Sequence, residues 1–269
     1  MPAASAPSNK AKIARRVIEV LEYFDDTHRE ATVMDIVRRY NRPQSSTSEL
    51  LSSLVELGLL YKDPYSRSYS LAPRAALLGT AGQTSAIRDG RLVGLIDRLV
   101  AQTGLSVALF GRVELKAQIV SWHAGSRAAA QATCGLFGGL QEPLTDSAAG
   151  WLLLSTIAQP RRDGILRRLN AEASESRKFA LAEMAARVQA CQDRGHVHGK
   201  AGFGATAEVL AVLLPGQDEP HPMAVGLVYG QEDRVNRESL LHCIGEAVEQ
   251  CFAPGETLTA TVERLSNAA

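Results

Sequence analysis

The spacing of hydrophobic residues in the first part of the chain predicts three successive helices. Apolar side chains recur every three or four positions over 10–24, 32–40 and 44–57, and this spacing aligns them on one face of a helix. Thr32 and Asp35 have the spacing of a capping box at the start of the second segment. Each predicted helix therefore has one apolar stripe to bury against the others.

The pattern changes after Gly58, which is expected to end the third helix. Residues 59–61 and 68–71 are predicted strands. Between them, Asp63-Pro64-Tyr65-Ser66 is typical of a type I turn, with Asp in the first position and Pro in the second. Three helices followed by a small hairpin describe a winged helix-turn-helix.

Beyond the hairpin, residues 75–104 keep a helical spacing, and the Ser, Thr and Gly residues within 79–90 favour a connection between two domains. The remaining sequence alternates between strand and helix patterns. Strands are predicted at 105–112, 115–122, 203–214 and 223–229. Helices are predicted at 147–158, 161–171, 178–194 and 236–252. This mixture suggests an α/β sheet domain that is covered by helices.

These patterns divide the chain into four parts. We expect a disordered tail over 1–9, the winged helix-turn-helix over 10–78, a linker helix over 79–96 and a second domain over 97–269.

Composition argues against several classes of protein. Hydrophobic residues make up 45% of the chain, which is ordinary for a globular protein and not for a disordered or fibrous one. The 29 Lys and Arg residues balance 29 Asp and Glu residues, so a strongly basic protein that coats nucleic acid without selectivity is not expected. The longest apolar runs are too short to cross a bilayer. No secretory signal is visible, and the four cysteines form no C-x-x-C pair, so we expect a cytoplasmic protein.

Motifs that carry enzymatic chemistry are missing from the sequence. It contains no G-x-S-x-G, P-loop, dinucleotide-binding fingerprint after a strand, or H-E-x-x-H. His196 and His198 lie close together, but two histidines alone do not define a metal site. We interpret them as part of a surface loop or of a strand edge. The sequence therefore predicts neither an enzyme nor a cofactor nor a bound metal.

Two stretches resemble the IclR family of bacterial transcription regulators. The first comprises Ser45-Ser46-Thr47-Ser48-Glu49-Leu50-Leu51, then 54–60, Tyr69-Ser70-Leu71-Ala72-Pro73-Arg74 and Leu77-Leu78-Gly79. The second is Pro143-Leu144-Thr145-Asp146-Ser147-Ala148-Ala149-Gly150-Trp151-Leu152-Leu153-Leu154. They occur in the order found in that family, and the resemblance covers about 10–253. It implies an α+β protein, in which a linker helix joins a winged helix-turn-helix to a GAF-like effector-binding domain.

The sequence departs from the family pattern at three positions. Glu49 stands where the family usually has an arginine that commonly meets DNA, Thr145 replaces a histidine and Trp151 replaces a lysine. Two interpretations of Glu49 are open. Its carboxylate can accept from a cytosine amino group, or it can close a capping box on Ser46.

The head of the third helix and the hairpin supply the candidate DNA contacts. Polar side chains at the start of a recognition helix meet base edges in the major groove, and arginines hold the phosphates. Arg67, at the tip of the wing, is placed to enter the adjacent minor groove. Alternatively, Arg38, Arg39 and Arg67 are only solvated surface charge. The candidate residues are Arg39, Arg42, Gln44, Ser45, Ser46, Thr47, Ser48, Lys62 and Arg67.

The resemblance implies a second site, in which the GAF-like domain binds a small molecule, often a carboxylic or aromatic acid. Such pockets are mostly apolar with a few polar groups. If Ser147 is the N-cap of its helix, the backbone N–H groups there would face a carboxylate. Phe110 and Trp122 are equally explained as core packing, and Cys134 as a loop residue. The candidates are Phe110, Trp122, Cys134, Leu136, Ser147, Thr206, Glu208 and Tyr229.

Together these features predict a ligand-responsive regulator that binds a palindromic operator as a homodimer or as a dimer of dimers. Half-sites would lie about 34–36 Å apart, one helical turn, or a multiple of it. Its expected partners are double-stranded operator DNA and a small-molecule effector, with no membrane. One alternative is an enzyme or small-molecule binder whose winged helix contacts protein. Another is an architectural DNA-binding protein without a ligand.

Overall fold

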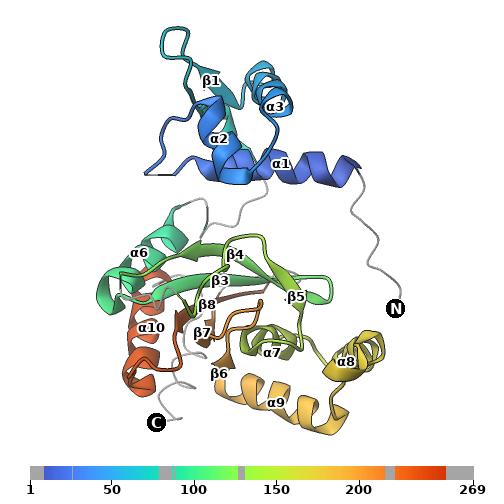
Figure 1. The fold of residues 1–269 in the computed structure, drawn as a ribbon. Coiled ribbons are helices and arrows are strands. Elements are labelled where there is room, and N and C mark those ends of the chain that lie inside the picture. Colours follow the sequence, from blue (N-terminus) through green and yellow to red (C-terminus); the bar gives the residue numbers. More distant parts are fainter. Residues whose placement is uncertain are drawn as a thin grey trace. The chain divides into compact units, whose positions relative to one another are not determined.

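The protein is described here by a computed structural model (Figure 1). The chain divides into two compact units, residues 1–83 and 84–269, and each is described by itself. Most of the tail expected at 1–9 and the first half of the linker helix expected at 79–96 lie outside the described residues. The structure describes residues 9–25, 27–78, 87, 89–126, 131–215 and 222–252.

The first unit has the predicted three helices and hairpin. The capping box of Thr32 is present, because the Asp35 carboxylate accepts hydrogen bonds from the Thr32 N–H at 2.8 Å and from its hydroxyl at 2.7 Å. Leu51, Leu54 and Tyr69 lie at the centre of the core. The elements are α1 (Asn9–Tyr23), α2 (Val33–Tyr40), α3 (Gln44–Glu56), β1 (Leu60–Lys62), β2 (Tyr69–Leu71) and α4 (Pro73–Leu77).

The wing between β1 and β2 is longer than the four-residue turn that the sequence predicts. Leu60 pairs with Leu71 and Lys62 with Tyr69 in an antiparallel ladder, so the loop runs from Asp63 to Ser68. The Asp63 carboxylate accepts from the backbone N–H groups of the next turn, and the Asp63 carbonyl accepts from the N–H of Arg67 at 3.0 Å. Arg67 has a φ of 58°, in the left-handed region.

Six strands of the described residues form one sheet in the second unit, in the order β5-β4-β3-β8-β7-β6 (Figure 1). Every neighbouring pair is antiparallel, which makes the fold α+β and confirms the class that the family resemblance implies. The short β5 and the strand at His196 were not among the predicted strands. The strands are β3 (Ser106–Val113), β4 (Lys116–His123), β5 (Gln141–Pro143), β6 (His196–Lys200), β7 (Glu208–Leu213) and β8 (Met223–Tyr229).

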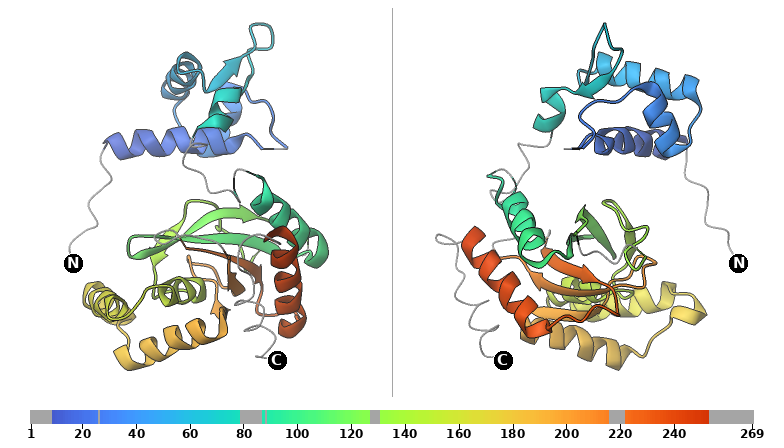
Figure 2. Two further views of the ribbon diagram at one scale, coloured as in Figure 1. Left: turned by 180° about the vertical axis from the view of Figure 1, so that it is seen from behind. Right: turned by 60° about the vertical axis from the view of Figure 1, so that its left-hand side comes forward.

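Helices cover both faces of this sheet (Figures 1 and 2). One face packs against α6 and α10, and the other against α7, α8 and α9. Leu92, Leu95, Ile96 and Leu99 of α6 are buried on the α10 face, so the described part of the expected linker helix belongs to the core of the second unit. The helices are α6 (Arg91–Thr103), α7 (Ala148–Ser155), α8 (Arg161–Glu172), the 3-10 turn η2 (Glu175–Arg177), α9 (Leu181–Arg194) and α10 (Arg237–Phe252).

Side chains alternate between the two faces along each strand, as a pleated strand requires. In β3, Val107 and Leu109 belong to the α10 face, whereas Ala108 and Phe110 belong to the α7 face. In the described part of the chain, no helix is long and apolar enough to cross a membrane.

Candidate functional site

The start of α3 presents the polar residues that the sequence assigned to DNA. Pro43 is the N-cap, and the Gln44 and Ser45 side chains are exposed directly after it. Ser48, one turn further, is half-buried. Ser46 is held in place, because its hydroxyl donates to the Pro43 carbonyl at 3.2 Å and accepts from Arg16 at 3.3 Å. The exposed group is therefore Gln44 and Ser45, with Ser48 at its edge.

Thr47 does not belong to this group, and its assignment as a DNA contact is corrected. It is buried, with 1% of its surface exposed, and its hydroxyl donates to the Pro43 carbonyl at 2.9 Å. It lies four and seven residues before the buried Leu51 and Leu54, and thus on the inner face of α3. The apolar spacing of the helix already indicated that position 47 lies on its buried face.

The capping-box interpretation of Glu49 is wrong. A capping box needs Ser46 at the N-cap, but α3 begins two residues earlier and Ser46 is its third residue. The Glu49 side chain is exposed on the helix surface. The carboxylate therefore adds a negative charge to the surface of α3.

The arginines before α3 differ in their availability. Arg39 is exposed in the last turn of α2. Arg42 is half-buried and forms an ion pair with Glu19 of α1, with its Nη2 3.2 Å from Oε2. This ion pair connects α1 to the segment before α3, so Arg42 has a structural role in the first unit.

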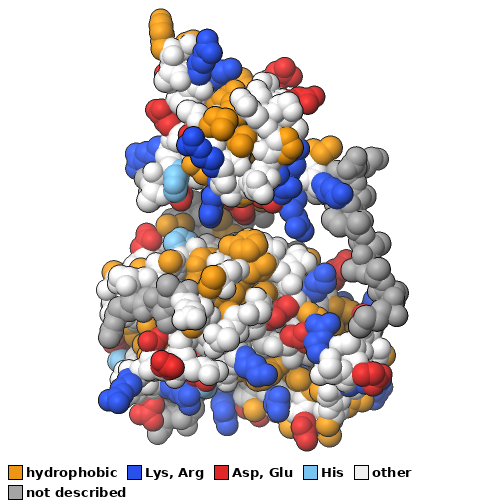
Figure 3. All heavy atoms as spheres, in the orientation of Figure 1, with side chains coloured by type: hydrophobic (Ala, Val, Ile, Leu, Met, Phe, Trp, Pro, Cys, Tyr) orange, Lys and Arg blue, Asp and Glu red, His pale blue; other side chains and the backbone are white. Residues whose placement is uncertain are grey.

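The wing carries two exposed cations (Figure 3). Lys62 lies at the end of β1 with its Nζ 5.4 Å from the centre of the Tyr69 ring, and Arg67 lies at the opposite end of the loop. Between them, Tyr65 is 96% exposed. The sequence prediction did not include this tyrosine in the DNA-contacting set, although it stands at the centre of the predicted turn.

Four of the predicted effector residues gather on the α7 face of the sheet. Phe110 and Leu136 are buried there, and Trp122 packs against the same core. Ser147 is fully buried and is the N-cap of α7, as expected, because its hydroxyl accepts from the Gly150 N–H at 3.3 Å.

Two further residues, which the sequence did not indicate, lie on this face. The Phe203 ring stacks on Phe110 with centroids 6.1 Å apart, and its backbone N–H donates to the Glu142 carboxylate at 2.7 Å. Burial raises the pKa of Glu142, while the hydrogen bonds from Phe203 and Ser147 oppose that shift. The Glu142 carboxylate thus lies beside Ser147 in this site.

Glu208 and Tyr229 lie on the opposite face, which corrects their place in the predicted site. They pair across β7 and β8, and Tyr229 packs in the core formed with α6 and α10. The predicted strand over 203–214 begins too early, because β7 starts at Glu208. The sequence pattern therefore did not predict which residues of this strand share a face of the sheet. Thr206 and Cys134 are exposed loop residues.

A polar cluster lies on this second face beside α10. His198 Nε2 is 2.9 Å from Glu208 Oε2, and Arg237 Nη2 is 3.5 Å from the same oxygen. The His198 and Tyr229 rings are stacked with centroids 6.4 Å apart. Of the two interpretations of the histidine pair, the strand edge is confirmed, because β6 is an outer strand. Within the described ranges, no group of three or more His, Cys, Asp or Glu residues could hold a metal.

Comparison with known proteins agrees with this architecture. Residues 14–64 match the model of the IclR helix-turn-helix domain, whereas no curated protein matches the sequence. The chain is similar to an IclR transcriptional regulator from Alicyclobacillus acidocaldarius, at 19% identity and a TM-score of 0.56, over 91% of this chain and 98% of that one. It is also similar to the Thermotoga maritima IclR, at 14% identity and a TM-score of 0.57, over 89% and 97%.

A third similar structure is an IclR homologue from Microbacterium hydrocarbonoxydans in complex with 4-hydroxybenzoate. It is 18% identical, with a TM-score of 0.54, over 95% of this chain and 99% of that one. The resemblance to the IclR family is therefore confirmed. The chain carries an IclR-type helix-turn-helix and shares the fold of these proteins.

Proposed function

We propose that this chain is a non-enzymatic transcription regulator that binds a palindromic operator as a dimer and responds to a small organic acid. One observation carries the proposal. The exposed polar head of α3 and the cationic wing belong to one compact unit, and its sequence matches the IclR helix-turn-helix. A recognition helix and a wing in one unit are the two parts that a winged helix uses on a duplex.

The two parts have different tasks. Gln44 and Ser45 carry amide and hydroxyl groups that can read base edges in the major groove. Arg39, Lys62 and Arg67 are exposed cations that can hold phosphates and fix the register of the helix. Glu49, on the surface of α3, would favour a cytosine amino group and repel phosphate.

A twofold operator calls for two copies of this unit. Ile13 and Ile18 of α1 are 56% and 54% exposed, although they follow the apolar spacing of that helix. They do not pack in the core of their own unit. These exposed apolar side chains support association with a second copy, and half-sites would then follow the twofold axis of the protein.

The effector would bind at the α7 face of the sheet. Phe110, Phe203, Trp122 and Leu136 supply apolar surface there, and Ser147 and Glu142 supply polar groups. The similar structure that holds 4-hydroxybenzoate supports a small aromatic or carboxylic acid as the ligand. Bound effector would shift operator affinity through a coupling free energy between the two sites.

The test is selection of genomic DNA fragments by the purified full chain at two salt concentrations. We expect enrichment of one pseudo-palindromic site, with affinity that falls steeply as salt rises. Arg39→Gln and Arg67→Gln should each lower the salt slope by about one, because each removes one phosphate contact. Arg167→Gln, an exposed arginine of α8, is the matched control and should change neither quantity.

Absence of enrichment, both alone and with an acid panel that includes 4-hydroxybenzoate, would contradict the proposal. It would favour the alternative in which the winged helix contacts protein. Effector response is read in the same assay as a change of operator affinity on titration of the acids.

A further inference from the structure

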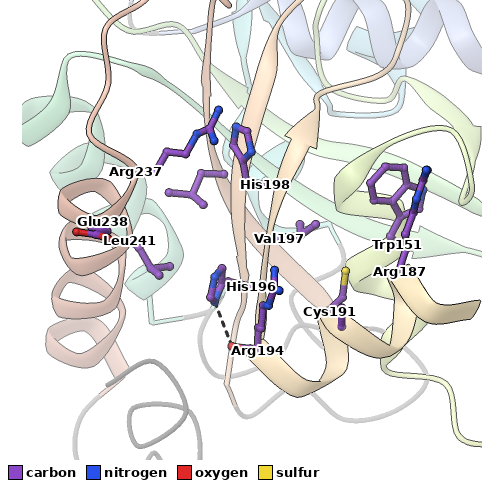
Figure 4. Close-up of a pocket in the computed structure, with 12 residues that line it drawn as sticks. Trp151, Arg187, Cys191, Arg194, His196, Val197, His198, Arg237, Glu238 and Leu241 are labelled. Carbon is purple, nitrogen blue, oxygen red and sulfur yellow. Dashed lines mark hydrogen bonds between the residues drawn. The ribbon is translucent and has the colours of Figure 1, made fainter. Parts of the chain in front are cut away.

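A groove runs along the outer edge of the sheet, outside the effector site proposed above. It follows β6, between the last turns of α9 and the first turns of α10, and has a volume of about 440 Å³ (Figure 4). This volume is in the range of sites that hold small molecules. The groove therefore has room for a metabolite.

Positive charge dominates the lining. The lining includes three arginines, Arg187, Arg194 and Arg237, and one acidic residue, Glu238. Arg187 lies over the Trp151 ring at 5.3 Å, on the α9 flank. Within the described residues, neither Arg187 nor Arg194 has an ion pair, and Arg237 has only its 3.5 Å approach to Glu208. Three guanidinium groups thus line the groove, and the carboxylates of Glu208 and Glu238 lie at the Arg237 end.

Two imidazoles lie between the arginines. His196 and His198 are two residues apart on β6 and therefore face the same side of the strand, toward α10. His198 lies beside Arg237 and His196 beside Arg194 (Figure 4). The His196 Nδ1 is 3.1 Å from the Arg194 carbonyl, which fixes the ring. Burial lowers the pKa of His196, so at neutral pH it adds a polar group and not a further charge.

A buried polar group lies next to this groove. The Tyr229 hydroxyl makes no hydrogen bond of ordinary geometry among the described residues, but it interacts with the Arg237 guanidinium. It lines an adjoining cavity that shares Arg237 and Glu238 with the groove. The backbone N–H groups of Glu238 and Ser239, at the start of α10, already donate to Asn236 Oδ1, so side chains and not the helix terminus would bind a ligand here.

We propose that this groove binds a small metabolite with two anionic groups, carboxylate or phosphate, one on Arg194 and one on Arg237. The guanidinium fork matches both kinds of anion in a bidentate fashion. The imidazoles would bind polar substituents between the two anionic groups. Binding at this site does not depend on the function proposed above; only a regulatory role for it would.

The experiment is calorimetric titration of the full chain with two probes, citrate and inorganic pyrophosphate, and with acetate as the single-charge control. We expect one of the two polyanions to bind, and the identity of that probe separates a carboxylate site from a phosphate site. Acetate should not bind in the same concentration range, because it can engage one arginine only.

Arg194→Gln and Arg237→Gln should each weaken that binding at least tenfold, whereas Arg167→Gln should leave it unchanged. The replaced arginines are exposed, so the variants should unfold at the same temperature as the parent. Failure of both polyanions to bind would overturn the proposal, as would equal weakening by all three variants. Operator binding by the same variants is measured in parallel, so a failure of DNA binding is separable from a failure of this site.

Discussion

The carboxylate of Glu142, in β5, accepts a 2.7 Å hydrogen bond from the backbone N–H of Phe203, in the loop before β7. Phe203 has a φ of 53° and stacks its ring on Phe110 of β3. One hydrogen bond thus connects an edge strand to the loop that closes the α7 face. The half-buried carboxylate gives this connection a dependence on pH.

When the pH rises from acidic to neutral, the protein loses the stability that protonated Glu142 contributes. Glu142→Gln should make this loss smaller. Burial raises the pKa of Glu142 above its ordinary value of 4.5, so the folded protein binds the proton more tightly than the unfolded chain. The stability that this proton contributes is present below the unfolded pKa and is lost as pH rises through the folded pKa. The glutamine oxygen still accepts from Phe203 and does not titrate. The measurement is the unfolding temperature of both proteins from pH 4 to pH 8.

We expect the variant to be at least as stable as the parent at neutral pH, and its advantage should shrink on acidification. If the variant instead becomes less stable relative to the parent as pH rises, its hydrogen bonds stabilise the carboxylate more than burial destabilises it.

Gly202→Ala should destabilise the second unit by about 2 kcal/mol or more, since it combines two costs. Gly202 has a φ of 82°, and a Cβ there would collide with the Glu142 carboxylate and the Ser147 side chain. Gly204 has a similar φ of 78° but open space around it. Gly204→Ala is therefore the matched control, with only the conformational cost of about 1 kcal/mol. Urea unfolding of the two variants measures the difference, and equal losses would contradict the steric part of the argument.

The first unit could be predicted almost entirely from its sequence because its signals are local. The capping pair Thr32–Asp35 and the apolar stripe of α3 act within one or two turns of helix. The capping-box interpretation of Glu49 required Ser46 at the N-cap, which disagrees with a helix that starts at residue 44 and has Pro43 as its N-cap. The length of the wing also escaped prediction, because the ladder ends at Lys62 and Tyr69 and not at the turn.

The second unit was less predictable, since its site depends on which residues share a face of the sheet. A shift of one residue in a strand exchanges its faces. Glu208 and Tyr229 were grouped with Phe110, but the register of β7 and β8 places them on the other side. The β5 strand has three residues and no alternating pattern, so nothing local indicated that Glu142 would meet Phe203.

Ser45 and Thr47 should separate DNA binding from stability on one helix. Ser45→Ala removes an exposed hydroxyl from the proposed interface and should lower operator affinity about fivefold, the equivalent of one hydrogen bond of about 1 kcal/mol, with no change in unfolding temperature. Thr47→Val keeps the buried shape but loses the hydroxyl that donates to Pro43. It should cost about 1 kcal/mol of stability and leave affinity unchanged once the protein is folded. Paired titrations and thermal melts test this, and a loss of affinity in the folded Thr47 variant would return that residue to the interface.

Arg67→Asn should raise stability and lower DNA affinity at the same time. Arg67 has a φ of 58° at the end of the wing, a conformation that asparagine tolerates better than other residues with a side chain. The gain should be up to about 1 kcal/mol, while loss of the charge should lower the salt slope of operator binding by about one. Arg67→Ala is the control, because it removes the same charge without the conformational gain. If both variants keep the parental salt slope, Arg67 is a solvated surface charge. If the slope falls in both variants and stability rises only in the asparagine variant, Arg67 binds a phosphate from a strained backbone conformation.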